Sequence, residues 1–265
     1  MSTASSVRGM KDLFSVKGKV ALVTGGSRGI GAMIARGYVE NGVKTYITAR
    51  KADACEAAAK ELSAFGECIA IPADVSTSAG LASLVKELGA REPKLHILVN
   101  NAGANWAAPI AEYPESGWDK VLDVNLKSVF FLTQQLLPLL RAAGTHADPA
   151  RVINVGSIDG LHVPGLETYA YASSKAGVHH LTRALAHRLA REHITVNAVA
   201  PGPFESKMME QTLKTFGDAI KQACPRGRIG EPEDMAGVAI YLASRAGAYI
   251  TGAVIPVDGG IATTV

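Results

Sequence analysis

Cysteine and long apolar runs are what this 265-residue sequence most clearly lacks. Its three cysteines, Cys55, Cys68 and Cys224, are widely spaced and follow no metal-ligand pattern. This argues against a disulfide scaffold or a metal site and favours reduced thiols in a cytoplasmic protein. No apolar stretch approaches the roughly 18 residues that span a membrane, and the N-terminus lacks the apolar core of a signal peptide. We therefore expect neither a bound metal nor a membrane partner.

An excess of one charge is also missing. The 27 Lys and Arg residues and 24 Asp and Glu residues give a formal net charge of only +3. The basic residues are scattered among acidic ones and form no stripe, so nucleic acid is not an expected partner. A hydrophobic content of 48% and a charged content of 19% are ordinary for a globular protein with a buried core.

Apolar, β-branched segments alternate with segments of helical periodicity along the chain. Runs that suit buried parallel strands occur at 19–25, 44–49, 68–73, 96–100, 151–156, 194–199 and 254–257. Helical patterns long enough for crossovers occur at 29–41, 53–65, 77–89, 116–140, 168–191 and 232–243. The alternation predicts an α/β, Rossmann-type, doubly wound seven-stranded parallel sheet with helices on both faces. We expect residues 1–16 to form a flexible N-terminal extension and residues 17–265 a single domain.

Two long segments rich in Gly, Pro and polar residues, 101–115 and 201–231, are expected to form loops over the ligand cleft. The second contains Met208, Met209, Leu213 and Phe216, a spacing that suits an amphipathic lid helix. A plain surface helix packed on the domain explains the same pattern. Residues 144–149, before the fifth strand, are expected to form a surface loop.

A glycine loop follows the first strand and opens the first helix. It is Thr24-Gly25-Gly26-Ser27-Arg28-Gly29-Ile30-Gly31. Glycines in this position let backbone N–H groups approach a pyrophosphate, whose charge the helix N-terminus favours. The context of strand, loop and helix therefore predicts dinucleotide binding.

The second strand ends at Ala49-Arg50-Lys51, where an NAD-selective protein usually places an acid for the ribose hydroxyls. Arg50, with Arg28, instead offers cations for a 2′-phosphate, so NADP(H) is the expected cofactor. The alternative is that these cations are solvated residues of a turn. Two further segments have either a cofactor-binding or a structural role: Asp74-Val75 beside the adenine, and Asn100-Asn101-Ala102-Gly103 in a polar turn facing the cleft.

Tyr171 and Lys175 lie four residues apart on one helix, so they are spatial neighbours. At a separation of roughly 5 Å and an effective dielectric of about 20, the ammonium would lower the phenol pKa by about two units. Such a phenol can exchange a proton with an alcohol or carbonyl oxygen near neutral pH. Taken alone, this spacing also fits two unrelated surface residues.

Together these motifs resemble the short-chain dehydrogenase/reductase family. The resemblance covers residues 16–260 and rests on the glycine loop, Asn100-Asn101-Ala102-Gly103, Ser157, Tyr171-x3-Lys175, Asn125, Pro201-Gly202 and Val257-Asp258-Gly259-Gly260. It implies that Tyr171 is the proton donor and acceptor, and that Lys175 binds the nicotinamide ribose. It also implies that Ser157 hydrogen-bonds the substrate oxygen and that Asn125 holds a water. Pro201, Gly202 and Ser206 are then expected beside the nicotinamide.

Within the family the sequence is similar to the 3-oxoacyl-[acyl-carrier-protein] reductases, particularly the branch linked to rhamnolipid precursors. This implies NADPH-dependent reduction of a 3-oxoacyl thioester, or a related carbonyl, to the 3-hydroxy product. The alternatives are an alcohol, sugar or steroid dehydrogenase and a non-catalytic nucleotide binder. An apolar acyl groove is expected from Trp106, Pro109, Ile110, Leu161, Val163, Phe204 and Met208, although these residues can also simply pack the loops together.

An acyl carrier protein would need a basic rim, which Arg183, Arg188 and Arg191 offer and the adjacent Glu192 weakens. CoA-linked and free substrates therefore stay as alternatives. The resemblance also implies a homodimer or homotetramer built on the apolar faces of helices 116–140 and 168–191, whereas a monomer would turn these faces inward. The histidines are assigned structural or surface roles, with His162 as the expected exception in contact with substrate.

Overall fold

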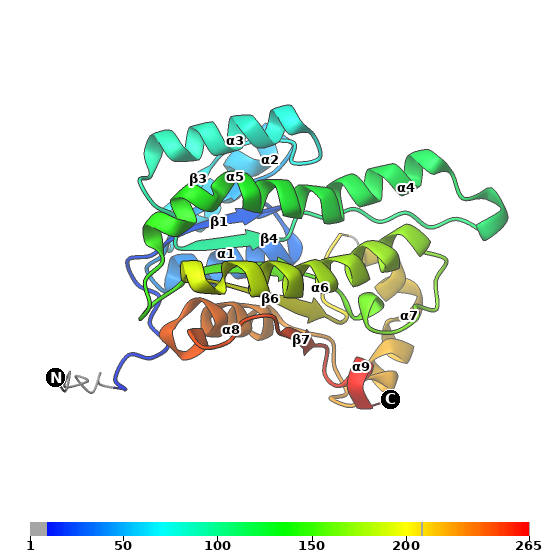
Figure 1. The fold of residues 1–265 in the computed structure, drawn as a ribbon. Coiled ribbons are helices and arrows are strands. Elements are labelled where there is room, and N and C mark those ends of the chain that lie inside the picture. Colours follow the sequence, from blue (N-terminus) through cyan, green and yellow to red (C-terminus); the bar gives the residue numbers. More distant parts are fainter. Residues whose placement is uncertain (1–9, 208, 265) are drawn as a thin grey trace.

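The computed structural model describes residues 10–207 and 209–264. Seven parallel strands form one sheet in the order β3-β2-β1-β4-β5-β6-β7, which confirms the expected doubly wound fold (Figure 1). The strands are β1 (Val20–Thr24), β2 (Lys44–Thr48), β3 (Cys68–Ala70), β4 (Ile97–Asn100), β5 (Ala150–Val155), β6 (Ile194–Pro201) and β7 (Val254–Val257). Each strand overlaps one of the apolar runs that the sequence analysis gives, because a strand covered on both faces is mostly apolar.

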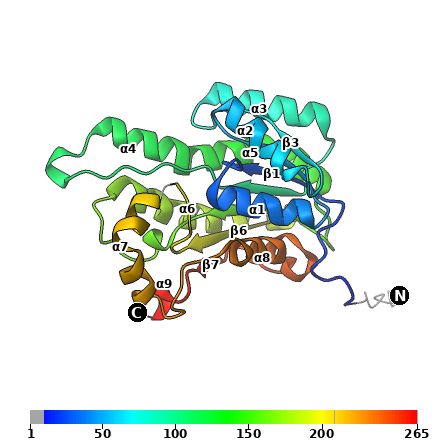
Figure 2. The same cartoon turned by 180° about the vertical axis from the view of Figure 1, so that it is seen from behind.

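The helices lie in two layers, one on each face of the sheet (Figures 1 and 2). One layer contains α1 (Gly29–Glu40), α2 (Ala52–Leu62) and α8 (Pro232–Ala243), whose buried residues Ile34, Leu62 and Leu242 belong to one core cluster. The other contains α3 (Ser78–Arg91), α5 (Ser128–Ala143) and α6 (Tyr169–Leu189), which bury Leu84, Leu136 and Leu189 in a second cluster. The sheet thus separates two apolar cores, as the sequence predicts.

The helix expected over residues 116–140 is interrupted. It consists of α4 (Glu115–Leu122), a π-helical turn (Asp123–Lys127) and α5. Asn125 sits within this turn, a rare geometry that often occurs at functional sites. The remaining helices are α7 (Glu210–Ala223) and the short α9 (Ile261–Thr264). Among the described residues, no helix is long and apolar enough to cross a membrane.

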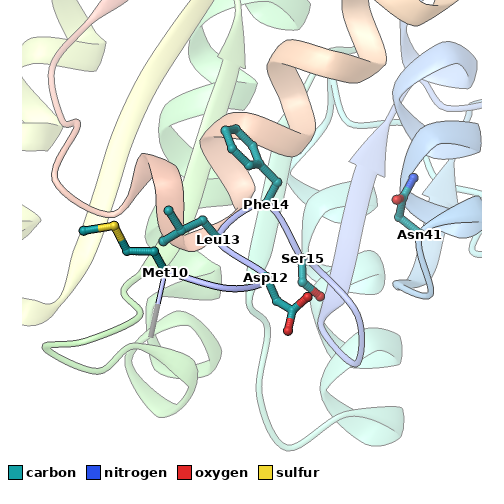
Figure 3. A pocket seen from close by; sticks show the side chains of 6 residues that line it. All are labelled: Met10, Asp12, Leu13, Phe14, Ser15 and Asn41. Atoms are coloured by element: carbon teal, nitrogen blue, oxygen red, sulfur yellow. The ribbon is translucent and has the colours of Figure 1, made fainter. Parts of the chain in front are cut away.

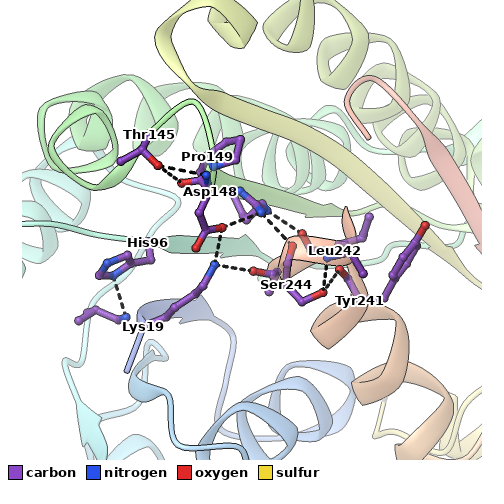
Figure 4. A network of polar contacts seen from close by, with 12 residues as sticks. Lys19, His96, Thr145, Asp148, Pro149, Tyr241, Leu242 and Ser244 are labelled. Carbon is purple, nitrogen blue, oxygen red and sulfur yellow. Dashed lines mark hydrogen bonds and ion pairs between the residues drawn. The ribbon is translucent and has the colours of Figure 1, made fainter. Parts of the chain in front are cut away.

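A buried polar network lies at the amino-terminal end of the sheet, opposite the expected cleft (Figure 4). Asp148 accepts from Lys19, which directly precedes β1, at 2.8 Å and from Arg151 of β5 at 2.9 Å. Arg151 is fully buried and also donates to the carbonyls of Leu242 and Ser244 at the end of α8. The segment expected to be a surface loop, 144–149, therefore also supplies the counter-charge that joins both strands to α8.

Residues 10–16, in the expected N-terminal extension, pack against the end of α8. Val16 is buried, the Ala246 N–H donates to the Leu13 carbonyl at 3.0 Å, and the Phe14 ring lies 6.2 Å from that of Tyr241. A cavity of about 490 Å³ beside this segment is lined by Met10, Asp12, Leu13, Phe14, Ser15 and Asn41 (Figure 3).

Candidate active site

A cavity of about 1260 Å³ opens beyond the carboxyl ends of the strands. It collects nearly all of the residues that the sequence places in a site: Gly25, Ser27, Arg28, Gly29, Ile30, Arg50, Asp74, Val75, Asn101, Ala102, Gly103, Ser157, Tyr171, Lys175, Pro201, Gly202 and Ser206. These residues come from the ends of strands β1 to β6, from the segments that follow them and from helix α6. The parallel order of the strands brings these segments to one edge of the sheet. Two expected residues, Gly31 and Asn125, lie outside the lining.

The glycine loop joins β1 to α1 at one end of the cavity. Gly25 and Gly29 have positive φ angles of 65° and 53°, a conformation that side chains with a Cβ rarely adopt. Helix α1 starts at Gly29, and its first turn has no side-chain cap. Uncapped N–H groups at a helix N-terminus favour a bound anion, so this end fits a dinucleotide phosphate.

Gly31 supports the loop from behind. A Cβ at this position would overlap the Gly25 carbonyl and the Asn101 side-chain amide. Gly31 is buried within α1 and is not among the residues that line the cavity. Its expected cofactor contact stays a prediction, and in this structure the absence of a Cβ lets α1 approach the loop closely.

Thr24 and Asn101 lock the glycine loop to the end of β4. Thr24 Oγ1 accepts from the N–H groups of Asn101 and Ala102 at 2.9 and 3.0 Å. The Asn101 amide in turn donates to the carbonyls of Thr24 at 2.8 Å and Gly25 at 3.2 Å. The Asn101 side chain thus shapes the loop, while its backbone borders the cavity.

Positive charge gathers near the glycine loop. Arg28, Arg50 and Lys51 are exposed and line the same cavity. Asp74 faces this region, where hydrogen bonds from Ser76 and the positive charge of Arg50 hold the pKa of its carboxyl below its usual value. The guanidinium groups of Arg28 and Arg50 can each bind two phosphate oxygens. The region therefore suits a phosphate better than ribose hydroxyls without a phosphate.

Ser157, Tyr171 and Lys175 lie together on the opposite wall of the cavity. Ser157 follows β5 and begins a 3₁₀ turn (Ile158–Gly160), where its Oγ accepts from the Asp159 N–H at 3.1 Å. Tyr171 and Lys175 are one turn apart on α6, and the Lys175 ammonium lies 5.4 Å from the centroid of the Tyr171 ring. Lys175 Nζ donates to the Val155 carbonyl at 2.8 Å, which fastens α6 to the end of β5.

Burial sets the protonation of the Tyr171 phenol. It raises the pKa of Tyr171 to about 12, against the lowering effect of the hydrogen bond with Ser157, and the Asp159 carboxylate raises it further. The expectation that Lys175 brings this pKa near neutrality is therefore wrong for the polypeptide alone. Removal of the phenolate from water has the largest effect on this pKa.

Lys175 shifts in the opposite direction. Burial lowers the pKa of its ammonium to about 8, and the Asp159 carboxylate partly offsets this effect. At neutral pH the phenol is protonated and the amine carries its charge. This combination provides a proton donor with a cation beside the phenolate that forms when the proton leaves.

Asn125 lies behind this wall and is almost fully buried. Its Oδ1 accepts from the Ala104 N–H at 2.8 Å, and its Nδ2 donates to the Ala104 carbonyl and to Ser174 Oγ, each at 3.0 Å. Asn125 therefore joins the loop after β4 to α6. A Cβ at Gly103 would lie 3.6 Å from Asn125 Oδ1 and 3.9 Å from Lys175 Nζ, so both groups approach the same backbone position.

The segment after β6 closes the cavity near the glycine loop. Ser206 lies so close to Gly29 that a Cβ on this glycine would approach the Ser206 Cβ to 3.3 Å. Ser206 Oγ accepts from the Met209 N–H at 3.3 Å, which fixes the hydroxyl at the start of the segment that precedes α7. Pro201 and Gly202 extend the end of β6 into the same wall.

The apolar groove differs from the expected one. Trp106 and Phe204 line the cavity, and the Trp106 ring stacks on Gly117 of α4 with the Lys120 ammonium 5.2 Å from the ring centroid. Ile110 and Val163 are 73% and 91% exposed and, with Pro109 and Leu161, are not among the lining residues. These four residues therefore do not form the expected groove wall, although His162 and Leu166 from the same loop as Leu161 and Val163 do line the cavity. Met208 lies outside the described residues.

Helix α7 fits the lid hypothesis better than a packed surface helix, because none of its described residues is buried. Thr212 and Ile220 from α7, with Met209 before it, contribute to the cavity wall. Phe216 is 54% exposed. His162 lines the cavity, in agreement with its expected position near a substrate.

Two further residues near the site, Asp159 and His179, were missed by reasoning from sequence. Asp159 lines the cavity and acts on the pKa values of both Tyr171 and Lys175. His179 is buried one turn after Lys175 on α6. The spacing of four residues already indicated that His179, and not the adjacent His180, shares the face of Lys175. The described residues contain no cluster of three or more His, Cys, Asp or Glu side chains suited to a metal.

Known proteins share both the sequence and this architecture. A family model described as enoyl-(acyl carrier protein) reductase matches residues 25–262. The chain is 52% identical over 253 residues to the rhamnolipids biosynthesis 3-oxoacyl-[acyl-carrier-protein] reductase of Pseudomonas aeruginosa, covering 95% of this chain and 99% of that protein. It is 35% identical to the short-chain dehydrogenase/reductase PhomF of Diaporthe leptostromiformis, covering 94% of this chain and 93% of that protein. The P. aeruginosa RhlG/NADP active-site complex matches with a TM-score of 0.92 at 51% identity, covering 96% of this chain and 100% of that chain.

Proposed function

The chain belongs to the short-chain dehydrogenase/reductase family, and from this premise we propose that it reduces the keto group of a 3-oxoacyl thioester with NADPH. The observation that carries the proposal is a single cavity lined by the glycine loop, the Arg28 and Arg50 cations, and the group Ser157, Tyr171 and Lys175. A nucleotide sensor or scaffold has no need of the last three residues, so this arrangement favours an enzyme.

NADPH, when bound, supplies the hydride to the carbonyl carbon. The protein must then stabilise the developing alkoxide and protonate it. Ser157 donates a hydrogen bond to the substrate oxygen, and Tyr171 transfers its phenolic proton to that oxygen. Lys175 stabilises the phenolate that forms, and Asn125 holds the loop after β4 against α6 behind it.

The protonation states favour reduction over oxidation. A phenol with a pKa of about 12 is protonated at neutral pH, which is the form that a donor needs. An alkoxide is a stronger base than a phenolate, so transfer from Tyr171 is downhill. Oxidation of an alcohol would require the phenolate, which burial disfavours.

NADPH, and not NADH, is proposed from the residues around the glycine loop. Arg28, Arg50 and Lys51 give this end a positive charge that a 2′-phosphate would neutralise. Gly25, Ser27, Gly29 and Ile30 would hold the pyrophosphate, Asp74, Val75 and the turn Asn101-Ala102-Gly103 the adenosine side, and Pro201, Gly202 and Ser206 the nicotinamide. The RhlG structure, at 51% identity, contains NADP, which supports the same choice here.

The substrate class is proposed from the P. aeruginosa relative, whose name describes it as a 3-oxoacyl-[acyl-carrier-protein] reductase. In this chain Trp106, Phe204, Leu166, Met209 and Ile220 provide apolar wall for an acyl group. A carrier protein would meet Arg183, Arg188 and Arg191, which are exposed along α6 and its end. Glu192 is paired with Arg141 at 2.6 Å, so its charge is offset within the chain.

We also propose a cytoplasmic homodimer or homotetramer, with residues 17–265 as one domain. Trp118 on α4 and Phe130 and Phe131 on α5 are each between 37% and 40% exposed. Apolar side chains gathered on these neighbouring helices would be covered by the same face of a second copy. Light scattering of the purified chain measures the assembly, and a monomer at micromolar concentration would contradict this part of the proposal.

The substrate assignment is tested by NADPH oxidation with an acetoacetyl thioester, a sugar ketone and a ketosteroid. We expect the thioester to give the highest kcat/KM. Activity on the sugar ketone or steroid with none on any thioester would support the alternative dehydrogenase. Charge reversal of Arg183 and Arg188 to Glu should raise KM for a carrier-linked thioester and leave a CoA-linked one unchanged.

A further inference from the structure

Helix α6 carries three functional side chains in steps of four residues, because His179 follows Tyr171 and Lys175 on the same face. His179 is 2% exposed and is not among the residues that line the cavity. It lies beneath the segment Gly156–Gly160, which bears Ser157 on its cavity side. The buried imidazole therefore contacts the catalytic segment without access to substrate.

Two glycines leave the space that the imidazole fills. A Cβ at Gly156 would overlap His179 Nε2, and a Cβ at Gly160 would lie 2.8 Å from His179 Cε1. The ring thus occupies the volume that side chains on either side of the Ser157-Ile158-Asp159 turn would need. A flat ring fits between two glycine backbones where a branched aliphatic side chain of similar volume is too thick.

The polar interactions of His179 are also directed at the Ser157 turn. Neither ring nitrogen makes a hydrogen bond of good geometry within the described part of the chain, but an interaction with the Gly160 backbone raises the pKa of the imidazole against the effect of burial. Burial has the larger effect and lowers this pKa to about 4, so the ring is uncharged at neutral pH. The ring is therefore placed by packing against Gly156 and Gly160 and by its interaction with the Gly160 backbone.

Hydrogen bonds also hold the Ser157 turn. The Gly156 N–H donates to the Val199 carbonyl at 2.8 Å, and the Gly160 N–H donates to the Ser157 carbonyl at 3.1 Å. Lys175 holds the preceding residue, Val155, at 2.8 Å. Helix α6 therefore contacts the end of β5 at two points one turn apart: Lys175 binds the Val155 carbonyl, and His179 packs against Gly156.

We propose that His179 is a positioning residue. Its imidazole packs against the Ser157 turn and thereby fixes the Ser157 hydroxyl next to Tyr171. The proposal rests on the function proposed above, because it assigns His179 to the step that Ser157 serves. Loss of the ring would let the turn sink toward α6 and move the hydroxyl away from the substrate oxygen.

The test compares His179→Ala with His180→Ala, the exposed neighbour on the same helix. Displacement of a reacting group by about an ångström lowers rates by about 100-fold, so we expect kcat of His179→Ala to fall by about 10- to 100-fold. NADPH affinity should stay within about twofold of native, since the ring does not touch the cavity. His180→Ala should retain native kcat.

A double-mutant cycle separates positioning from general loss of structure. If His179 acts through Ser157, adding His179→Ala to Ser157→Ala should lower kcat by less than about twofold further. Full multiplication of the two effects, or a native kcat in a folded His179→Ala protein, would overturn the proposal. If His179→Ala fails to fold, His179→Gln takes its place, and a fall in kcat that persists or disappears on Ser157→Ala decides in the same way.

A readout without turnover keeps this proposal distinct from the function. Gly156→Ala should destabilise the native protein strongly, because its methyl meets the imidazole, but should be tolerated in the His179→Ala background. Chemical unfolding measures this coupling even if no thioester is reduced. If Gly156→Ala destabilised both backgrounds equally, the imidazole would not support the turn, whatever the substrate.

Discussion

The Lys175 ammonium lies 5.4 Å from the centre of the Tyr171 ring and is held there by the Val155 carbonyl. Burial separates the two titrations, with the pKa of Tyr171 near 12 and that of Lys175 near 8. Between these values the phenol keeps its proton while the amine loses its charge. The activity of the site at alkaline pH is therefore limited by the lysine and not by the tyrosine.

The first prediction concerns this alkaline limit. Below pH 8 the ammonium stabilises the developing phenolate, and as pH rises through about 8 that charge is lost. We expect kcat for reduction to fall by up to about tenfold per pH unit above this point. Initial rates of NADPH oxidation at saturating substrate measure the profile. A profile that stays flat to pH 10 would contradict the assignment.

Asp159→Asn provides the matched variant for this profile. The Asp159 carboxylate raises the pKa of both Tyr171 and Lys175, so its neutralisation should lower both. The alkaline limb should then move to lower pH. An unchanged limb would mean that Asp159 does not act on Lys175 in the working enzyme.

Tyr171→Phe tests the proton donor directly. The substitution keeps the ring and removes only the hydroxyl, so we expect kcat to fall by about 10²- to 10⁴-fold. The phenylalanine ring still fills the cavity wall, and NADPH affinity measured by fluorescence titration should change little. Tyr169→Phe, two residues away on α6, is the control and should keep native turnover. Substantial turnover in Tyr171→Phe would remove the residue from the mechanism.

Sequence reasoning could group the candidate site residues because most of them follow strand ends. A parallel sheet brings every such position to one edge, so Gly25, Arg50, Ser157 and Ser206 lie around one cavity without any long-range calculation. The strands could also be predicted from the sequence, because a strand buried on both faces is apolar along most of its length.

The sequence could not reveal how burial acts on this cavity. The charge of Lys175 is visible in the sequence, but the removal of Tyr171 from water depends on packing by distant segments, and it reverses the expected pKa shift. The same limit applies to His179, whose position under Gly156 and Gly160 depends on how α6 crosses β5. The direction of side chains in the loops could not be predicted from the sequence either. Ile110 and Val163 were expected in the groove but are exposed to solvent.

Cofactor selectivity should depend on Arg50. In Arg50→Asp the new carboxylate repels a 2′-phosphate and can bind ribose hydroxyls instead. A charge-assisted hydrogen bond is worth about 1.5 to 3 kcal/mol, so affinity for NADPH should fall by about 10- to 100-fold while affinity for NADH stays level or rises. Lys60→Asp, on the exposed face of α2 outside the cavity, controls for net charge. Equal effects of both variants would show that Arg50 does not touch the phosphate.

The network at the other end of the sheet makes a prediction for stability. Asp148 is the acid that pairs with both Lys19 and Arg151, whose side chains are 10% and 1% exposed. Asp148→Asn leaves two neighbouring buried cations without their counter-charge, and since the Asp148 side chain is itself 35% exposed, the free energy of unfolding should fall by about 1 to 3 kcal/mol. Urea denaturation measures the change. Glu210→Gln, which breaks an exposed pair with Lys214, should cost about 0.5 kcal/mol or less. A similar small loss in both would mean that the buried network contributes nothing special.

Acid stability should depend on His179. Burial lowers its pKa from 6.5 to about 4, and the Lys175 and Arg183 charges on the same helix act in the same direction. Between these two pH values the unfolded chain binds a proton that the folded protein excludes, so folding weakens as pH falls from 6.5 toward 4. The loss attributable to this residue reaches up to about 3 kcal/mol. His179→Gln should be less sensitive to acid across that window, whereas His180→Gln should follow the native protein. Urea midpoints compared at about pH 7 and about pH 5 measure the difference, and parallel slopes for all three proteins would show that the ring is not held uncharged in the folded state.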